Sequence, residues 1–378
     1  MIKSIALLTD GIHPFVLGGM QKHSLGLCRA LAWSGVKVIL FHGIPEGNPV
    51  PSNEEVVQAI FPNGNLPPVL PEINTVIFPA AGKVPGHYLR RSKRFSREIA
   101  RQLNQYKVDL IYCQGFTGWT ILENKMRKAP VWVNFHGLNM FQKSFGWRAQ
   151  LESFMLRGPV KSQLQRADKV ISLGGRLTEI LLEMGISSSK ILVQPNGLDQ
   201  FWYENTEKIK INTPRKILFV GRNDKVKGLD LLFPVLNMFT TDKVEFHFVG
   251  PFNSSESKNN ANIIFHGVIS DETEMRSLMD KMDFAICSSY SEGMPTFLLE
   301  AMSRSCALIS TDVGAVSELV TTQNGILIIP GSTEALYSGI KKGIEMSDEE
   351  LLNMKQASLS HAAKFTWNSI VQSMDVGA

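Results

Sequence analysis

The strongest chemical signal in the sequence is a pair of glutamates eight residues apart, within the segment SSYSEGMPTFLLEAM at residues 288–302. Glu292 follows the apolar run FAIC in a loop with glycine and proline, and Glu300 lies in a segment with a helical pattern. Each carboxylate can accept two hydrogen bonds, which suits a pair of neighbouring hydroxyl groups. Either glutamate alone would usually be a solvated surface residue, but the order strand–Glu–Gly–x–Pro–helix–Glu is much more specific.

Between the two glutamates the sequence predicts the start of a helix just after a strand. Pro295 suits the first helical position, because its missing N–H would have no partner there. The amides that would be unpaired at the positive end of the helix dipole are those of Gly293, Met294, Thr296 and Phe297. A phosphate or sugar oxygen can bind such amides, and Gly293 lets a ligand approach the backbone closely.

A second segment, FVGRNDKVKGLDLL at residues 219–232, brings two cations to the start of another expected helix. Arg222 offers a fork of donors to phosphate oxygens, and Lys227 offers a point charge. Taken alone, the segment is equally compatible with an ordinary basic loop between a strand and a helix. It is not a Walker A loop, because the order Gly-Lys-Ser/Thr is absent.

Short apolar runs alternate with helical patterns along the whole chain, which is typical of buried parallel sheets. The strands expected in the first half are at residues 3–9, 36–41, 75–79, 109–113, 131–135, 169–173 and 191–194. Those in the second half are at residues 216–221, 244–250, 262–267, 284–287, 307–311 and 325–330. The pattern predicts an α/β protein with two Rossmann-like, doubly wound domains and a ligand-binding cleft between them.

The expected domain boundary lies in the polar segment at residues 194–216, which contains Asn-Gly and precedes a new strand. We therefore divide the chain into a first domain at residues 1–198 and a second at residues 199–360. The tail at residues 361–378 is predicted to form a final helix that completes the first domain.

Charge balance, cysteine spacing and the length of apolar runs argue against several classes of protein. The 378 residues include 39 basic and 35 acidic side chains, a balance that gives no reason to expect nucleic-acid binding. The four cysteines are scattered without metal-site spacing, so neither a disulfide framework nor a zinc ribbon is expected. The sequence shows neither a secretory apolar region nor an apolar run of membrane-spanning length, which predicts a cytoplasmic protein.

These motifs, in this order, resemble the retaining glycosyltransferases of family 4, which have the two-domain GT-B fold. The resemblance covers nearly the whole chain and includes LGGMQKH (17–23), NFHG (134–137), VQPNGLD (193–199), STDVGAVSELV (310–320) and FTW (365–367). One departure follows LLEAM, where the family often has a small residue and glycine. Here Arg304 and Ser305 occupy that turn.

The resemblance implies a nucleotide-sugar donor, held mainly by the second domain, and a saccharide or lipid-linked acceptor, held by the first. Arg222 and Lys227 would bind the diphosphate and stabilise the leaving group. Glu292 and the backbone at residues 293–296 would hold the donor sugar, and Glu300 would hold the ribose hydroxyls. No Asp-x-Asp element is present, so neither a metal ion nor a cofactor is expected. The implied role is sugar transfer in polysaccharide, lipopolysaccharide or glycolipid assembly.

Three more residues receive roles from the resemblance. Gly18 and Gly19 would let the first loop close on the diphosphate and the acceptor, and His136 would lie near the transferring sugar. Retention of anomeric configuration would need no protein nucleophile, because the departing phosphate could accept the proton of the acceptor hydroxyl. Glu292 is therefore interpreted as a binding residue.

The most basic region, residues 82–107, contains eight basic residues and one acidic residue. A helix there, with Phe95, Ile99 and Leu103 on one face, could cover the sheet with its basic residues outward. It could also lie on anionic lipid or bind a phosphate-bearing acceptor. We expect a peripheral contact of residues 83–107 with the inner face of the membrane.

Three other classes of protein are alternatives to a transferase, and the sequence argues against the third. A sugar-nucleotide epimerase would share the fold, and a catalytically silent binding protein on this fold is not excluded. A dehydrogenase would need Gly-x-Gly-x-x-Gly after the first strand, and the loop DGIHPFVLGGMQ lacks that spacing.

Overall fold

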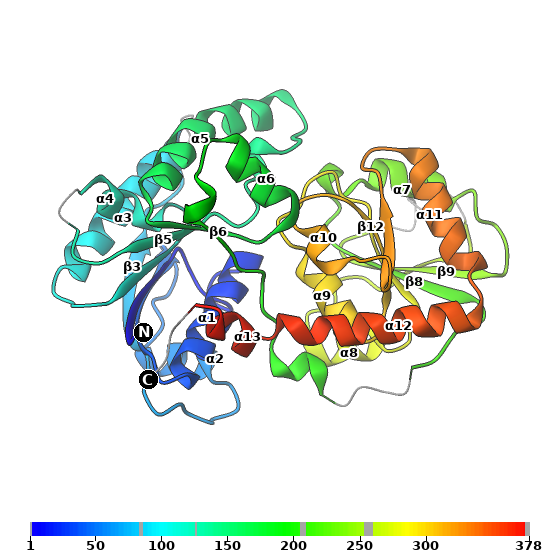
Figure 1. Ribbon diagram of the computed structural model, residues 1–378, viewed down its shortest axis with the longest axis horizontal. Helices are drawn as coiled ribbons and strands as arrows, with labels where there is room; N and C mark the ends of the chain where they lie inside the picture. The colour runs from blue at the N-terminus through cyan, green and yellow to red at the C-terminus, as the bar shows by residue number, and fades with distance from the viewer. Residues whose placement is uncertain (1, 83–85, 125–126, 205–208, 253–259, 375–378) are drawn as a thin grey trace.

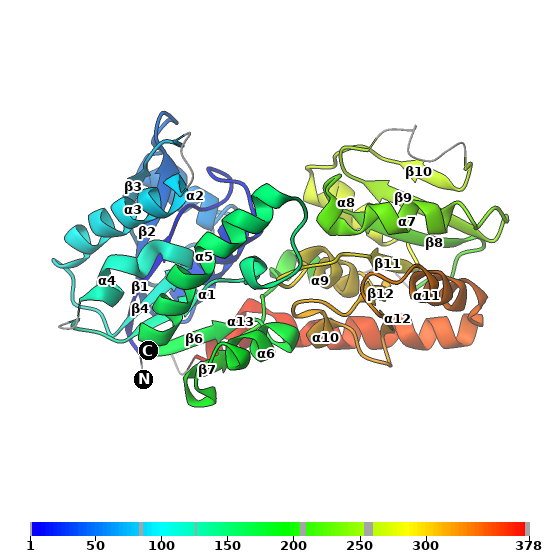
Figure 2. The same cartoon turned by 90° about the horizontal axis from the view of Figure 1, so that it is seen from above.

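The computed structural model consists of two parallel β-sheets, each covered by helices on both faces (Figures 1 and 2). It describes residues 2–82, 86–124, 127–204, 209–252 and 260–374. The expected fold class, α/β with two doubly wound units, is confirmed.

The first sheet has seven parallel strands in the order β3-β2-β1-β4-β5-β6-β7. The third strand in this order is buried between neighbours that present apolar residues to it; Ala6, for example, lies opposite Ile39 and Ile111. The strands are β1 (Ser4–Thr9), β2 (Lys37–Pro45), β3 (Glu72–Phe78), β4 (Leu110–Gln114), β5 (Val131–Asn134), β6 (Lys169–Ser172) and β7 (Ile191–Val193).

Two helical layers cover this sheet. The helices are α1 (Gly19–Trp33), α2 (Asn53–Ile60), α3 (His87–Leu103), α4 (Trp119–Glu123), α5 (Trp147–Arg166) and α6 (Gly175–Glu183). The buried residues of α3, α4, α5 and α6 belong to one hydrophobic cluster and those of α1 and α2 to another. The sheet is therefore doubly wound, with its strand ends free to line a site.

The second sheet has six parallel strands in the order β10-β9-β8-β11-β12-β13. They are β8 (Arg215–Val220), β9 (Val244–Val249), β10 (Ile263–Phe265), β11 (Phe284–Cys287), β12 (Ala307–Thr311) and β13 (Gly325–Ile328). The helices around it are α7 (Leu229–Leu236), α8 (Glu272–Met279), α9 (Thr296–Ser303), α10 (Val316–Leu319), α11 (Thr333–Glu345) and α12 (Asp348–Ala362). One buried cluster continues from the first sheet into the second through Leu198, Trp202 and Met294.

Each strand run expected from the sequence forms a strand, with ends that differ by a few residues. The prediction of one final helix after Ser360 is wrong, because α12 already begins at Asp348 and ends at Ala362. A short turn follows, and α13 (Trp367–Gln372) starts anew after Thr366, whose hydroxyl accepts the N–H of Ser369. Helix α13 packs on α1, one of the helices that cover the first sheet (Figure 1). Residues 375–378 lie outside the described part.

The boundary at residues 198/199 stays a prediction. The first sheet ends at Val193 and the second begins at Arg215, so the expected division falls in the connecting segment.

Helix α3 covers the sheet with its apolar face inward. Phe95, Ile99 and Leu103 are buried in the core, so these side chains are not available to a membrane. The exposed residues of the opposite face are basic, including Arg94 and Arg97. Lys83, which belongs to the predicted basic region, lies outside the described residues.

The turn that departs from the family pattern, Arg304-Ser305, has a clear structural basis. Ser305 has φ 64°, the left-handed conformation that glycine adopts most easily. The Arg304 guanidinium is fully buried and forms two hydrogen bonds to Asp280, at 2.7 and 2.8 Å. It also donates to the carbonyl oxygens of Trp202 and Glu204, so it holds the segment that connects the sheets.

Replacing Ser305 with glycine is expected to raise the free energy of unfolding by about 0.5–1 kcal/mol. Relief of a left-handed conformation, worth about 1–2 kcal/mol, outweighs the extra entropy of glycine in the unfolded chain. The buried Ser305 hydroxyl has no hydrogen-bond partner among the described residues, so its removal adds no penalty. Urea unfolding measures the change. The same substitution within α8, Ser277→Gly, should instead destabilise, and equal effects of the two would contradict the interpretation.

Candidate functional site

A buried ion pair joins the segment at residues 219–232 to the segment at residues 288–302. The Lys227 ammonium lies 2.7 Å from Oε1 of Glu292, and both side chains are mostly buried. Burial alone would lower the pKa of Lys227, but the Glu292 carboxylate raises it overall, so the lysine is charged. The strand ends of β8 and β11 place the two residues next to each other, as the parallel topology requires.

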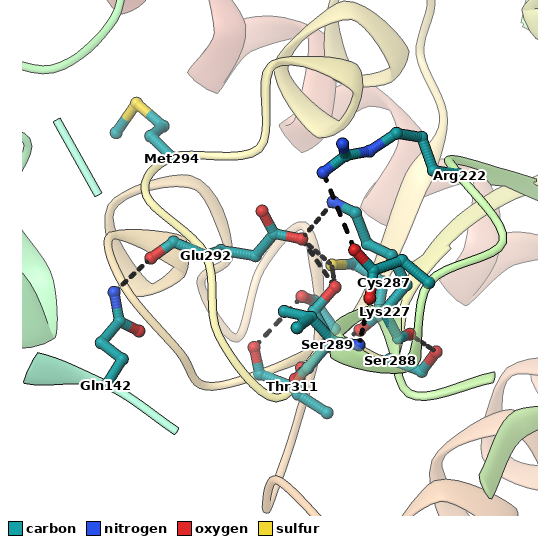
Figure 3. Close-up of polar contacts among 12 residues, drawn as sticks. Gln142, Arg222, Lys227, Cys287, Ser288, Ser289, Glu292, Met294 and Thr311 are labelled. Carbon is teal, nitrogen blue, oxygen red and sulfur yellow. Dashed lines mark hydrogen bonds and ion pairs between the residues drawn. The ribbon is translucent and has the colours of Figure 1, made fainter. Parts of the chain in front are cut away.

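Further groups hold the Glu292 carboxylate in place (Figure 3). The Ser289 hydroxyl donates to Oε1 at 2.6 Å, and the Cys287 thiol lies 3.9 Å from the same atom. Thr311 donates to the Ser289 carbonyl oxygen at 2.7 Å, which ties the loop to β12. These polar contacts of the carboxylate all involve Oε1, which leaves Oε2 to accept a hydrogen bond from a ligand.

The backbone of the Glu292 loop contacts a loop in the first half of the chain. The Gln142 amide donates to the Glu292 carbonyl oxygen at 2.7 Å. A β-carbon on Gly293 would lie 3.1 Å from Cα of Gly137, so the close approach of the two loops leaves little room for a side chain there. The ion pair therefore lies where the two halves of the chain meet.

The turn after Glu292 leads into α9 as predicted. Pro295 precedes the first helical residue, Thr296, so it occupies the N-cap, one position before the first helical position predicted for it. Met294 is buried and bound by Asn196, whose backbone N–H lies 3.2 Å from the Met294 sulfur. Asn196 also donates through its side chain to the Met294 carbonyl oxygen at 3.3 Å.

A cleft of about 950 Å³ lies beside this turn, between the two sheets. Among the predicted site residues it is lined by Gly19, Thr296 and Glu300. The residues Arg222, Lys227, Glu292 and His136 are not part of its lining. The structure thus brings the predicted residues to one region, but in two adjoining groups.

Glu300 faces this cleft from α9. Burial raises its pKa to about 7, Lys22 opposes the rise, and Glu272 adds to it. Lys22 and Glu272 themselves form an ion pair at 2.8 Å, which connects α1 to α8 across the cleft. Glu300 therefore titrates close to neutral pH in the unliganded protein.

The remaining predicted residues differ in how strongly the surrounding structure constrains them. The Arg222 side chain is 82% exposed and lies 3.9 Å from Asp224, so it can reach a ligand. Gly19 begins α1, and a β-carbon there would meet no atom within 4 Å. Gly18 has φ 154°, a conformation that residues with a β-carbon rarely adopt, so of the two glycines only Gly18 is required by the backbone.

His136 belongs to a chain of polar side chains at the strand ends of the first sheet. Its Nε2 lies 2.6 Å from Oε1 of Gln114, whose amide nitrogen lies 3.0 Å from Nδ1 of His23. An amide oxygen accepts, so this contact assigns the proton of His136 to Nε2 and leaves Nδ1 as an acceptor. Burial lowers the pKa of His136 to about 4 and that of His23 well below its ordinary value. Both rings are therefore neutral at neutral pH.

The backbone at His136 is constrained as well. Its φ is 56°, a left-handed value that is rare outside glycine, and its N–H donates to the Asn134 side chain at 2.7 Å. Such conformations cluster at functional sites.

Sequence reasoning missed several residues that the structure places at the site. Gln114 ends β4, and carboxyl ends of parallel strands were already the expected ligand-binding edge, so this residue could have been found. Lys22, Gln142 and Glu272 carry no local signal, because their partners are distant in sequence.

Two family models match the chain. Residues 17–200 match "Glycosyltransferase Family 4", and residues 214–345 match "Glycosyl transferases group 1". The matched ranges contain the strands of the two sheets described above, apart from β1, and together they span most of the chain.

Curated relatives and solved structures agree with these matches. A putative teichuronic acid biosynthesis glycosyltransferase, TuaC of Bacillus subtilis, is 26% identical over 191 residues, which cover 48% of each chain. The present chain thus spans about half the length of that relative. An N,N'-diacetylbacillosaminyl-diphospho-undecaprenol alpha-1,3-N-acetylgalactosaminyltransferase of Campylobacter jejuni is 26% identical, over 72% of this chain and 77% of its own.

The crystal structure of Anabaena Alr3699/HepE in complex with UDP-glucose is similar throughout. Its TM-score is 0.66 at 15% identity, over 99% of this chain and 98% of that one. At this identity the likeness shows the fold alone. Taken with the family matches and the two parallel sheets, it shows that the chain belongs to the group 1 glycosyltransferases of family 4 and has the GT-B fold.

Proposed function

We propose that this protein transfers a sugar from a nucleotide-sugar donor to a saccharide or lipid-linked acceptor in polysaccharide or glycolipid assembly. The observation that carries the proposal is the Lys227–Glu292 pair at the junction of the two sheets, beside the cleft that contains Glu300. Cations and a carboxylate side by side suit a ligand that has both a diphosphate and sugar hydroxyls.

In the proposed complex, Lys227 and the exposed Arg222 bind the donor diphosphate. As the bond between the sugar C1 and the phosphate oxygen breaks, negative charge grows on that oxygen, and the fixed cations stabilise it. The acceptor oxygen bonds to C1 on the same face, and its proton passes to the departing phosphate. The reaction thereby retains the anomeric configuration, and it needs no metal ion or other cofactor.

Glu292 acts in this scheme as a binding residue. Its Oε1 is already occupied by Lys227 and Ser289, and Oε2 is available to accept a sugar hydroxyl. No protein nucleophile is needed in this scheme, because the departing phosphate accepts the proton of the acceptor hydroxyl. The adjoining backbone at residues 293–296 and the ribose-binding Glu300 complete the donor site, and Gly18 and Gly19 form the loop that closes over it.

His136 contributes as an acceptor. Since its Nε2–H is directed to Gln114, its Nδ1 can accept a hydrogen bond from a hydroxyl of the transferring sugar. A neutral imidazole in this environment is a poor proton donor, so His136 positions the sugar.

A named relative and the basic surface of α3 bear on the acceptor and the cellular location. The Campylobacter relative is named for a diphospho-undecaprenol acceptor, which favours a lipid-linked acceptor here. The exposed basic residues of α3, within the range 83–107, would then lie near the inner face of a cytoplasmic membrane. None of the helices in the described residues is both long and apolar enough to cross a membrane.

Nucleotide release from a panel of UDP-, GDP- and ADP-sugars, in buffer with a metal chelator, tests the proposal. Release from one donor should occur in wild type and be lost in Glu292→Ala and Arg222→Ala. The surface variant Arg176→Ala should behave as wild type, because Arg176 pairs with Glu179 on the exposed face of α6. Release without a transferred product would favour an epimerase. Neither release nor thermal stabilisation by any donor would favour a silent binding protein.

The affinity for the intact nucleotide-sugar is expected to fall about tenfold between pH 8 and pH 6. With a pKa of about 7, Glu300 is ionised at the higher pH and protonated at the lower, and only the carboxylate accepts two ribose hydroxyls. Calorimetry with the unhydrolysed donor measures this effect without the titration of a free phosphate. Glu300→Gln should bind weakly and independently of pH, whereas a pH dependence that survives this substitution would contradict the assignment.

A further inference from the structure

Helix α5 exposes apolar side chains where a surface helix normally has polar ones. Trp147, Leu151 and Phe154 are 70%, 47% and 72% exposed. Their spacing of four and three residues aligns them along one face of the helix. The face that packs on the sheet is a different one, which buries Val160 and Leu164. The outward apolar stripe therefore contributes no packing to the hydrophobic core.

The stripe continues into a groove beside α3. A hollow of about 450 Å³ separates the two helices, and Trp147 and Leu151 form part of its wall. Tyr88 and Leu89, at the start of α3, line the other side. Figure 2 shows α3, α4 and α5 together on the same side of the first sheet, so the stripe, the groove and α3 form one surface.

Positive charge is concentrated on the same two helices. Helix α5 contains four basic residues and one acidic residue, and α3 contains six and one. The whole chain has a net charge of only +4, so the remainder is acidic overall. Arg148 lies beside Trp147 at the head of the stripe, and Arg94 and Arg97 are exposed on α3.

We propose that the outward face of α5, together with the basic face of α3, docks on an anionic phospholipid bilayer. Trp147, Leu151 and Phe154 would insert at the level of the headgroups, and the surrounding cations would attract the acidic lipids. Apolar insertion and charge act together, and either alone gives weak, reversible binding. The buried apolar face of α3 is not needed.

Docking on lipid would extend the proposed function, because it would bring the first sheet to a lipid-linked acceptor at the membrane. The role of docking, though not docking itself, therefore rests on the proposed sugar transfer. Docking on lipid involves neither the ion pair nor the cleft. Binding to vesicles can therefore be measured without donor or acceptor, and its failure would leave sugar transfer to soluble acceptors untouched.

Sedimentation with vesicles tests the proposal on the full chain. Wild type should bind vesicles with equal amounts of phosphatidylcholine and phosphatidylglycerol, and should not bind phosphatidylcholine alone. Trp147→Ser/Phe154→Ser should weaken binding by roughly tenfold or more, because two large apolar side chains lose their burial in lipid. Arg94→Gln/Arg97→Gln should weaken it by about tenfold at low salt and less at high salt.

A matched control removes equally exposed apolar groups from the other half of the molecule. Met238 and Ile329 are 61% and 72% exposed there, and Met238→Ser/Ile329→Ser should bind as wild type does. Equal loss in this control, or no binding by wild type, would overturn the proposal. So would a dimer in solution without lipid that Trp147→Ser/Phe154→Ser abolishes, because the stripe would then be covered by a second copy.

A second measurement reports which side chain enters the lipid. Brominated lipid should quench tryptophan fluorescence in wild type, and the quenching should be largely lost in Trp147→Phe, which keeps the stripe apolar. Quenching that is unchanged in this variant would place other tryptophans at the lipid and contradict the assignment to α5.

Discussion

Replacing Lys227 with methionine is expected to slow sugar transfer by about 10²–10³-fold, the usual loss when one fixed group that stabilises transition-state charge is removed. The lysine is held 2.7 Å from Glu292 and beside Arg222, so its charge is already in place when the phosphate departs. The loss should appear mainly in kcat, because charge on the leaving oxygen develops during bond breakage. Steady-state kinetics with the donor found in the release assay would measure both parameters.

Lys225 provides the matched control for this substitution. It lies in the same turn, but its ammonium is 5.1 Å from the centre of the Phe145 ring and does not contact Glu292. Lys225→Met makes the same chemical change and should keep kcat within a few-fold of wild type. A loss in Lys225→Met as large as that in Lys227→Met would mean that only the net charge of the turn matters.

Replacing Arg304 with methionine is expected to lower the free energy of unfolding by about 3–5 kcal/mol, the typical loss when one partner of a buried ion pair is removed. The guanidinium is fully buried, and its removal leaves Asp280, which is 11% exposed, without its two hydrogen bonds. The contacts to the Trp202 and Glu204 carbonyl oxygens are lost as well. Urea unfolding followed by tryptophan fluorescence would report the loss.

Two variants separate this explanation from a general effect of lost charge. Arg304→Met/Asp280→Leu should recover most of the stability, because the uncompensated carboxylate is gone. Arg176→Met removes an arginine from an exposed pair with Glu179 and should change the free energy of unfolding by less than about 1 kcal/mol. If the double variant remained as unstable as Arg304→Met, the buried carboxylate would not be the cause.

The fold was predictable because its signals are local. An apolar run such as FAIC at residues 284–287 is buried on both faces of a parallel sheet, so its pattern reads as a strand without knowledge of its neighbours. The start of α9 was predictable for the same reason, since Pro295 and the residues around it set the backbone there. The exception was the tail, where a continuous helical pattern concealed the break before Thr366.

The sequence by itself determined the two-sheet architecture, the family, and the two segments that hold Lys227 and Glu292. Only the tertiary structure decided that these residues touch, that Gln114 orients His136, and that the apolar stripe of α5 faces outward. The physical reason is that backbone preference and burial pattern act over a few neighbouring residues. An ion pair, a tautomer or the exposed face of a helix depends instead on atoms brought together from distant parts of the chain.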